Sequence, residues 1–370
     1  MPKPRKQRYV WKGPEVDGIT QSMLSRFMVC RERFRLLTVE GLKPVDRFNH
    51  RIEFGNMWHV CEEYQEGDWA DKLREYSLQL RARYRESNEQ IEKWFNVCLV
   101  QFPVYIQYWK EHETEQVKPL LKEWVFNSPF TLPSGRIVRL RGKMDGVDLV
   151  GKKQPALYLL EHKTKGEIFQ EQLVRQLTFD LQTMLYLTVL KESWYDREAI
   201  VGKLSYQKMK LAGIRYNVVR RPLSGGKHTI TRLKNVNKGK RSPNGERLPP
   251  REESAKEYYG RLRGLISEEP EHYFMRWRVE VTPADLERFK REFLNPILEQ
   301  LCDWWEAIQE CDGEPFNAPT PHQGRHWRTP YGFYNVLAEG GSAELDEYLA
   351  TGSEIGLQRV QKLFTELEKD

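Results

Sequence analysis

The chain has 370 residues, of which 39% are hydrophobic and 12% aromatic, and its formal net charge is +6. This length allows one large or two ordinary domains, and the composition is that of a globular protein, which excludes disordered and fibrous classes. No apolar stretch approaches the ~20 residues of a membrane span, and no apolar segment follows the basic N-terminus as in a signal peptide. We therefore expect a soluble intracellular protein with no membrane partner.

Five cysteines are scattered along the chain, and none forms a C-x-x-C pair: Cys30, Cys61, Cys98, Cys302 and Cys311. An odd number of scattered cysteines favours free thiols in a reducing compartment over a disulfide framework or a zinc site.

The first third of the chain has the pattern of helices. Thr20 and Ser22 are N-cap candidates ahead of a helix over 23–37, a second helix is predicted over 54–64, and the spacing over 71–113 predicts two more. We assign residues 1–115 to a helical N-terminal region.

Strands follow. We predict one over 120–126 that holds Glu123, a turn at 131–135, a strand from 136 that leads to Asp145, a turn at 150–155, and a strand that ends in Glu161-His162-Lys163. Because side chains alternate across a strand, Glu161 and Lys163 share a face and His162 points away. If the last two strands pair, Asp145, Glu161 and Lys163 converge.

Two carboxylates beside an ammonium predict a site for a hard divalent cation. Mg²⁺ and Mn²⁺ prefer oxygen ligands and are held through one or two carboxylates together with substrate phosphate oxygens. The bare pattern also fits an exposed turn acid with a strand-end ion pair. The apolar run at 157–160 favours the metal site, since consecutive charges at the end of a buried strand are costly unless they are paired or bound to metal.

The remainder predicts a helix over 169–190, strands over 200–206 and 213–221, a mobile loop over 225–251 rich in Gly, Lys, Asn and Pro, and helices over 258–265 and 283–309. The fold class is therefore α/β, with an α-β-β-β-α-β core of central mixed sheet and flanking helices. We divide it into a core at 116–222, a basic flexible loop at 223–256, and a helical region at 257–370 that completes the same domain.

Positive charge is concentrated in one stretch. Residues 199–245 contain twelve Lys or Arg and no Asp or Glu, which favours a polyanion, nucleic acid first, over a merely solvated loop. The candidate phosphate-binding residues there are Lys203, Lys208, Lys210, Arg220, Arg221, Lys227, Arg232, Lys234, Lys238, Lys240 and Arg241.

Taken together and in order, the motifs resemble those of the PD-(D/E)XK nuclease superfamily, in its RecB-like branch that includes phage-type exonucleases. The matching elements are Cys30-x-x-x-Phe34, Gly55-x-x-x-His59, Gly142-x-x-Asp145, Glu161-x-Lys163 and Gln182-x-x-x-Tyr186, within roughly residues 19–300.

The resemblance implies a restriction-endonuclease-like core and a metal-dependent DNA nuclease with one or two Mg²⁺ or Mn²⁺ ions. Asp145, Glu161 and Lys163 would be catalytic. His59, Asp145, Glu161 and the backbone carbonyl of His162 would bind metal, and Glu123 is a further candidate ligand. Gln182 and Tyr186 would contact DNA or support the lysine. Several relatives hold a [4Fe–4S] cluster; here the late cysteines are missing, so we expect none.

The expected substrate is DNA, and the expected activity is an exonuclease at DNA ends in recombination, repair or phage DNA metabolism. A recombination or replication protein is a candidate partner, and a bacterial or phage-infected cytoplasm is the expected location. Two alternatives stay open: a catalytically silent RecB-like DNA-binding or scaffolding subunit, and a structure-specific endonuclease. A nucleotide-using enzyme is disfavoured, because neither G-x-G-x-x-G nor a P-loop occurs.

Overall fold

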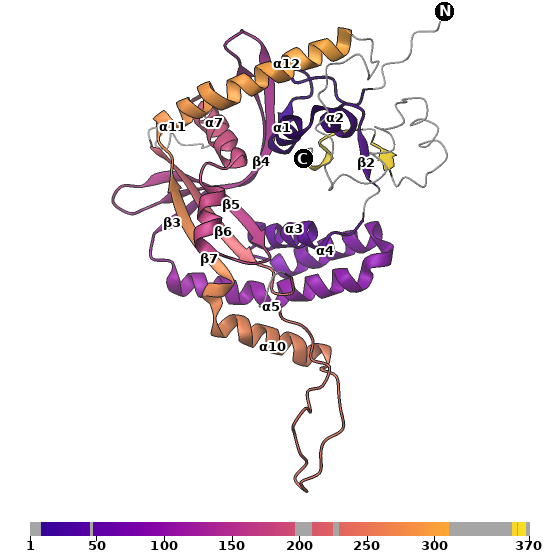
Figure 1. The fold of residues 1–370 in the computed structure, drawn as a ribbon. Helices are drawn as coiled ribbons and strands as arrows, with labels where there is room; N and C mark the ends of the chain where they lie inside the picture. The colour runs from indigo at the N-terminus through magenta and orange to yellow at the C-terminus, as the bar shows by residue number, and fades with distance from the viewer. Residues whose placement is uncertain are drawn as a thin grey trace, which may run out of the picture.

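The computed structural model describes residues 9–44, 47–196, 209–224, 229–310, 357–360 and 362–367. In this part of the chain a six-stranded mixed sheet lies between helical layers (Figure 1). Its strands are β1 (Ile19–Thr20), β3 (Val117–Thr131), β4 (Ile137–Val150), β5 (Ala156–Lys165), β6 (Leu211–Arg220) and β7 (Phe274–Glu280). The order is β1-β4-β5-β6-β7, with β3 along the other edge of β4. Only β1–β4 and β5–β6 are parallel pairs. The predicted α/β architecture is confirmed. A separate two-stranded sheet pairs β2 (Leu42–Pro44) with β8 (Leu357–Arg359).

Each face of the sheet is covered by its own group of helices. One hydrophobic cluster joins the sheet to α1 (Gln21–Val29), α6 (Gln170–Leu177), α7 (Leu181–Asp196) and α12 (Asn295–Glu310). The other contains α3 (His50–Glu63), α4 (Trp69–Arg83), α5 (Asn88–His112) and α10 (Ala255–Glu268), with the ends of β6 and β7. Figure 1 shows α7 and α12 on one side of the sheet and α3 to α5 on the other. The apolar sides of these amphipathic helices bury both faces of the central strands.

Three predicted helices are interrupted. Cys30 has an extended backbone that ends α1, and α2 (Arg31–Phe34) and the π-helix η1 (Arg35–Val39) follow. The helix predicted over 169–190 is two helices, because Phe179 takes a left-handed backbone with φ of 56° between α6 and α7. Glycine is the usual residue in that position after a helix, so the sequence has no signal for this break. The helix predicted over 283–309 is α11 (Pro283–Phe289), the π-helix η4 (Lys290–Leu294) and α12.

Strand β7 was not predicted, whereas the strand predicted over 200–206 lies outside the described residues. The predicted mobile loop is, over 229–254, an irregular hairpin closed by backbone hydrogen bonds such as Val236 N to Arg251 O at 2.9 Å. It projects beyond α10, away from the sheet (Figure 1). No helix in the described part of the chain is both long and apolar enough to cross a membrane.

Candidate metal centre and catalytic site

The site lies where two central strands separate. Strands β4 and β5 pair from Val150 and Ala156 up to Gly146 and Leu160. Beyond this point β4 remains paired with β3 on its other edge, while the edge that faced β5 is unpaired as far as its contact with β1. Asp145 and Glu161 are the next residues beyond the last pair. At this opening the Asp145 carboxylate accepts a hydrogen bond from the backbone N–H of His162, in place of a backbone carbonyl of the ladder.

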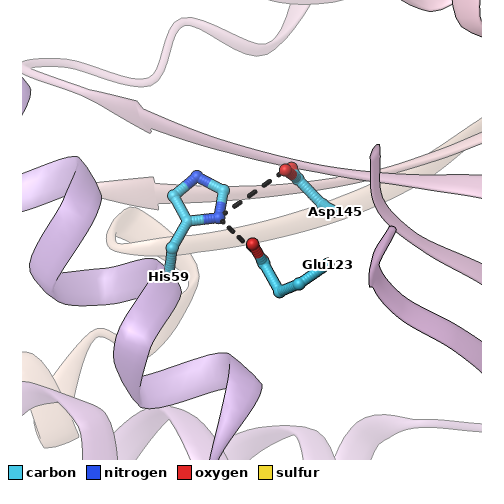
Figure 2. A group of neighbouring side chains, drawn as sticks. All are labelled: His59, Glu123 and Asp145. Atoms are coloured by element: carbon cyan, nitrogen blue, oxygen red, sulfur yellow. Dashed lines mark ion pairs between the residues drawn. The ribbon is translucent and has the colours of Figure 1, made fainter. Parts of the chain in front are cut away.

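Three side chains meet on one side of this opening. The Nδ1 atom of His59 on α3 lies 3.6 Å from an oxygen of Glu123 and 3.6 Å from an oxygen of Asp145 (Figure 2). One ligand atom from each residue lies within 4.8 Å of those of the other two. One imidazole nitrogen and two carboxylates at such separations are a plausible ligand set for Mg²⁺ or Mn²⁺.

Glu123 reaches this group because of its backbone. It lies between the paired residues Lys122 and Trp124 of β3, opposite Asp145 on β4, and its φ is 49°. A non-glycine residue in this left-handed region costs about 1–2 kcal/mol, and such strain concentrates at functional sites. Lys143, two residues before Asp145, forms an ion pair with Glu123. Sequence reasoning missed Lys143, although alternation along β4 places it on the face of Asp145.

Helix α3 carries His59 to the strands through a close contact. Asn49 caps the helix by accepting a hydrogen bond from Arg51 N at 3.0 Å. Gly55 lies against the end of β5, where an added Cβ would sit 3.4 Å from the hydroxyl of Thr164. Residues four apart share a helix face, so the glycine that allows the close approach also directs His59 toward the site. This is a physical reason for the Gly-x-x-x-His spacing.

A second group lies beside the first. Lys163 Nζ donates to Glu161 Oε1 at 2.5 Å and to Gln182 Oε1 at 2.8 Å, and Gln182 Nε2 donates to the same Glu161 oxygen at 2.9 Å. Asp180 starts α7 by accepting a hydrogen bond from Gln182 N at 3.2 Å. The structure therefore brings Glu161, Lys163 and Gln182 together, with Gln182 holding the relative positions of the acid and the ammonium.

Burial and neighbouring charges shift the titration of the site. Burial and the Asp145 carboxylate raise the pKa of Glu161 to about 8, although Lys163 opposes the shift. Burial disfavours a charged His59, but Asp145 and Glu123 outweigh it and raise the pKa of that imidazole to about 9. Likewise, burial of Lys163 opposes charging, yet Glu161 raises its pKa, so the side chain is an ammonium at neutral pH. All three pKa values are thus shifted toward the protonated form, and neighbouring carboxylates contribute to each shift.

One buried atom supports a cation directly. Among the described residues, Oε2 of Glu161 has no hydrogen-bond partner although the side chain is only 2% exposed. A buried carboxylate oxygen without a partner is costly. A divalent cation between this oxygen and the group of His59, Glu123 and Asp145 would satisfy it, so the residues present fit such an ion.

His162 faces the other way from its neighbours on β5. Its backbone N–H donates to Asp145 Oδ2 at 2.6 Å, while its Nδ1 lies 2.7 Å from the amide nitrogen of Asn217. The metal-binding role of its carbonyl stays a prediction.

A cavity of about 420 Å³ opens on the side of the sheet that His162 faces, and it is lined by His162, Asp145 and Glu123 among others. Beside it, Asp148 is buried on β4 and accepts a hydrogen bond from Arg215 Nη1 at 2.9 Å.

The predicted DNA-binding residues fall in different places. Tyr186 is buried under the site, edge-on to Phe126 at 5.3 Å, which suits support rather than contact with DNA. Arg220 and Arg221 end β6 beside the end of β5, where Arg221 donates to Thr164 O at 3.1 Å. Lys210 lies at the far end of β5, since Leu157 N donates to its carbonyl at 2.9 Å.

The remaining basic candidates that the structure describes are not at the strand opening. Five of them are on the projecting hairpin: Arg232, Lys234, Lys238, Lys240 and Arg241. Lys203, Lys208 and Lys227 lie outside the described residues. Within the described residues, the basic stretch therefore does not form one surface around the acids.

Comparison with known proteins gives one family. The model for the PD-(D/E)XK nuclease superfamily matches residues 19–313, which include all six strands of the main sheet and every acid, lysine and histidine of the site. A search of curated proteins found no match.

Proposed function

The chain belongs to the PD-(D/E)XK nuclease superfamily, and on that basis we propose that it is a Mg²⁺- or Mn²⁺-dependent deoxyribonuclease that degrades DNA from its ends. The observation that carries the proposal is the convergence of Asp145, Glu161 and Lys163 with His59 and Glu123 at one strand opening. The motif order supports assignment to the RecB-like branch, and with it a role in recombination, repair or phage DNA metabolism.

Each residue has a role in the proposed reaction. His59, Glu123, Asp145 and Glu161 would hold the cation, which when bound supplies a Lewis acid for the scissile phosphate and lowers the pKa of water. Lys163, held as an ammonium by Glu161 and by Gln182, lies where it can stabilise negative charge that develops on the phosphate.

Gln182 acts through its neighbours. It fixes the ammonium and the carboxylate in one geometry, so neither reorganises as charge develops. The completeness of this constellation disfavours the silent binding subunit, since loss of catalysis removes the constraint on the acids and the lysine.

The test compares DNA topologies. Linear DNA labelled at its 5′ or 3′ end and a closed circle are incubated with Mg²⁺, with Mn²⁺ or with a chelator, using the wild type, Asp145→Asn and Lys163→Ala. Lys152→Ala, in the exposed turn between β4 and β5, is the matched control and should behave as the wild type.

We expect metal-dependent loss of linear DNA only, abolished by both site substitutions. Nicking of the circle would show an endonuclease instead. Salt-sensitive DNA binding without cleavage under either metal would leave only a binding subunit.

A further inference from the structure

Two exposed aromatic rings flank the helix that follows the catalytic strand. Phe169, just before α6, is 60% exposed, and Phe179, just after it, is 51% exposed. Large exposed apolar side chains are costly in water, and a single one needs no special explanation. Two phenylalanines at the two ends of one short helix, next to a catalytic site, do.

Both rings are close to the catalytic residues along the chain. Phe169 follows Lys165 by four residues, and Lys165 ends the strand of Glu161 and Lys163. Phe179 precedes Asp180, which caps the helix of Gln182. Since α6 has eight residues, it is roughly 12 Å long, and the two phenylalanines flank its opposite ends.

Phe179 also sits in a conformation that suits it poorly. Its φ of 56° places a β-carbon in the left-handed position after a helix, where glycine is favoured. The strain costs about 1–2 kcal/mol, and an exposed ring does not recover that cost by packing in a core. A strained and exposed aromatic side chain is therefore better explained by a ligand than by the fold.

Unpaired positive charge accompanies the rings. Lys165, Arg221 and Arg51 have no carboxylate within ion-pair distance in the described part of the chain, unlike many of the other lysines and arginines there. Arg221 N donates to Lys165 O at 2.7 Å, so these two residues are neighbours. Burial and the positive charges of Lys163 and Arg221 lower the pKa of Lys165, although the Asp180 carboxylate opposes the shift. Burial and the charge of Arg51 lower the pKa of Arg221.

Phosphates would relieve this repulsion, and unpaired bases would cover the rings. Combined stacking platforms and basic residues are the usual means of holding a single strand, because every base has an aromatic face. Paired bases in a duplex do not offer that face to a side chain.

We propose that Phe169 and Phe179 stack on unpaired bases of a DNA strand whose phosphates are held by Lys165 and Arg51, with the buried Arg221, which donates to Thr164 O and Ser224 Oγ, adding positive charge beside them. The DNA bound at the catalytic site is then single-stranded, either as a free single strand or as the frayed end of a duplex. This substrate class rests on the proposed nuclease function, which has its own test in the cleavage assay.

The experiment measures binding without divalent metal, so that cleavage does not interfere. Fluorescence anisotropy gives the Kd of the full-length protein for a short mixed-sequence single strand and for an abasic strand of the same length, which keeps the phosphates and lacks the bases. The variants are Phe169→Ala and Phe179→Ala. The control is Phe293→Ala, an exposed ring on η4, whose Lys290 pairs with Glu192 toward the other end of α7.

We expect each ring variant to weaken binding of the normal strand by about 5- to 100-fold and to leave the abasic strand unchanged, while the control changes neither. A 2-aminopurine base in the strand should lose its quenching in the same variants. Equal loss for both strands, or no loss for either, would overturn the stacking proposal. Unchanged DNA binding with loss of a co-purifying protein would identify a protein-binding surface instead and would also overturn it.

A second pair of variants separates stacking from folding. Phe179→Gly relieves the backbone strain, so it should keep or raise the Tm while it weakens binding, and Phe179→Trp should restore binding. A fall in Tm with Phe179→Gly, and no rescue by tryptophan, would mean that the ring serves the fold. Cleavage by the wild type is measured separately. If the wild type cleaves DNA but the ring variants bind it normally, only the stacking proposal is refuted. If binding depends on the bases but the wild type does not cleave DNA, only the nuclease proposal is refuted.

Discussion

The glycine of the Gly-x-x-Asp motif offers a sharp test of how the fold supports the site. In the structure a Cβ added to Gly142 would lie 2.7 Å from Cζ of Phe126 and 2.9 Å from a ring carbon of Tyr186. Phe126 pairs with Gly142 across β3 and β4, and Tyr186 belongs to the helix of Gln182. The glycine of one motif is therefore the surface on which the tyrosine of another motif packs.

Replacing Gly142 by alanine should force two rings or the strand to move. Overpacking of this kind costs about 1–3 kcal/mol. For a chain of 370 residues, whose unfolding entropy is of the order of 0.8 kcal/mol/K, this lowers the Tm by about 1–4 °C. Because Asp145 follows three residues later on β4, we also expect a lower kcat. Calorimetry and the cleavage assay measure the two effects.

Two further variants separate this steric explanation from a general cost of alanine. Phe126→Leu removes the nearest ring carbons, so the double variant with Gly142→Ala should be more stable, by about 1 kcal/mol, than the sum of the single changes predicts. Gly260 in α10 has nothing within 4 Å of an added Cβ, so Gly260→Ala should stabilise the helix by up to about 1 kcal/mol. Wild-type stability of Gly142→Ala, or the absence of coupling to Phe126, would refute the reasoning.

Three other predictions concern buried charge. Arg215→Ala leaves Asp148 as an unpaired buried carboxylate and should lower the free energy of unfolding in denaturant by about 3–5 kcal/mol. Replacing both residues by apolar ones should lower it much less. Equal losses of stability would contradict the ion-pair explanation. Gln182→Ala should lower kcat by about 10- to 100-fold with little change in KM, because Lys163 loses one of its two hydrogen-bond acceptors. An unchanged kcat would show that Glu161 alone positions the lysine. The pKa values of about 8 for Glu161 and about 9 for His59 mean that both side chains are largely protonated at pH 7. Binding of Mn²⁺ should therefore release about two protons, and the affinity should increase as the pH rises to about 8–9. Calorimetry in buffers of different ionisation enthalpy counts the released protons, and an affinity that does not depend on pH would refute this prediction.

Local pattern was enough to predict much of the core. The alternation over Glu161-His162-Lys163 predicts which side chains share a face, and in the structure Lys163 bonds Glu161 while His162 turns toward Asn217. The apolar run before them is a buried strand. These properties depend on neighbours in the sequence, because the periods of two and 3.6 residues are set by backbone geometry.

What only the tertiary structure decided depends on contacts between distant segments and on backbone conformations without a sequence signal. Pairing of β3 with β4 puts Glu123 opposite Asp145, and a left-handed φ directs its carboxylate to His59. Phe179 also takes a left-handed backbone conformation, and because it is not a glycine the sequence does not indicate this. The Asp148 side chain is paired with Arg215, 67 positions later in the chain, a contact that no local pattern predicts.

For the basic stretch, the sequence predicts the charge but not its position in the structure. Its charge is plain in the sequence, but five of its described basic residues lie on the hairpin that leaves the sheet beyond α10, so this part of the charge is not gathered around the acids. Composition determines that a segment favours polyanions, because Coulombic attraction needs only the charges. Where those charges lie relative to the catalytic residues depends on chain topology, which composition does not contain.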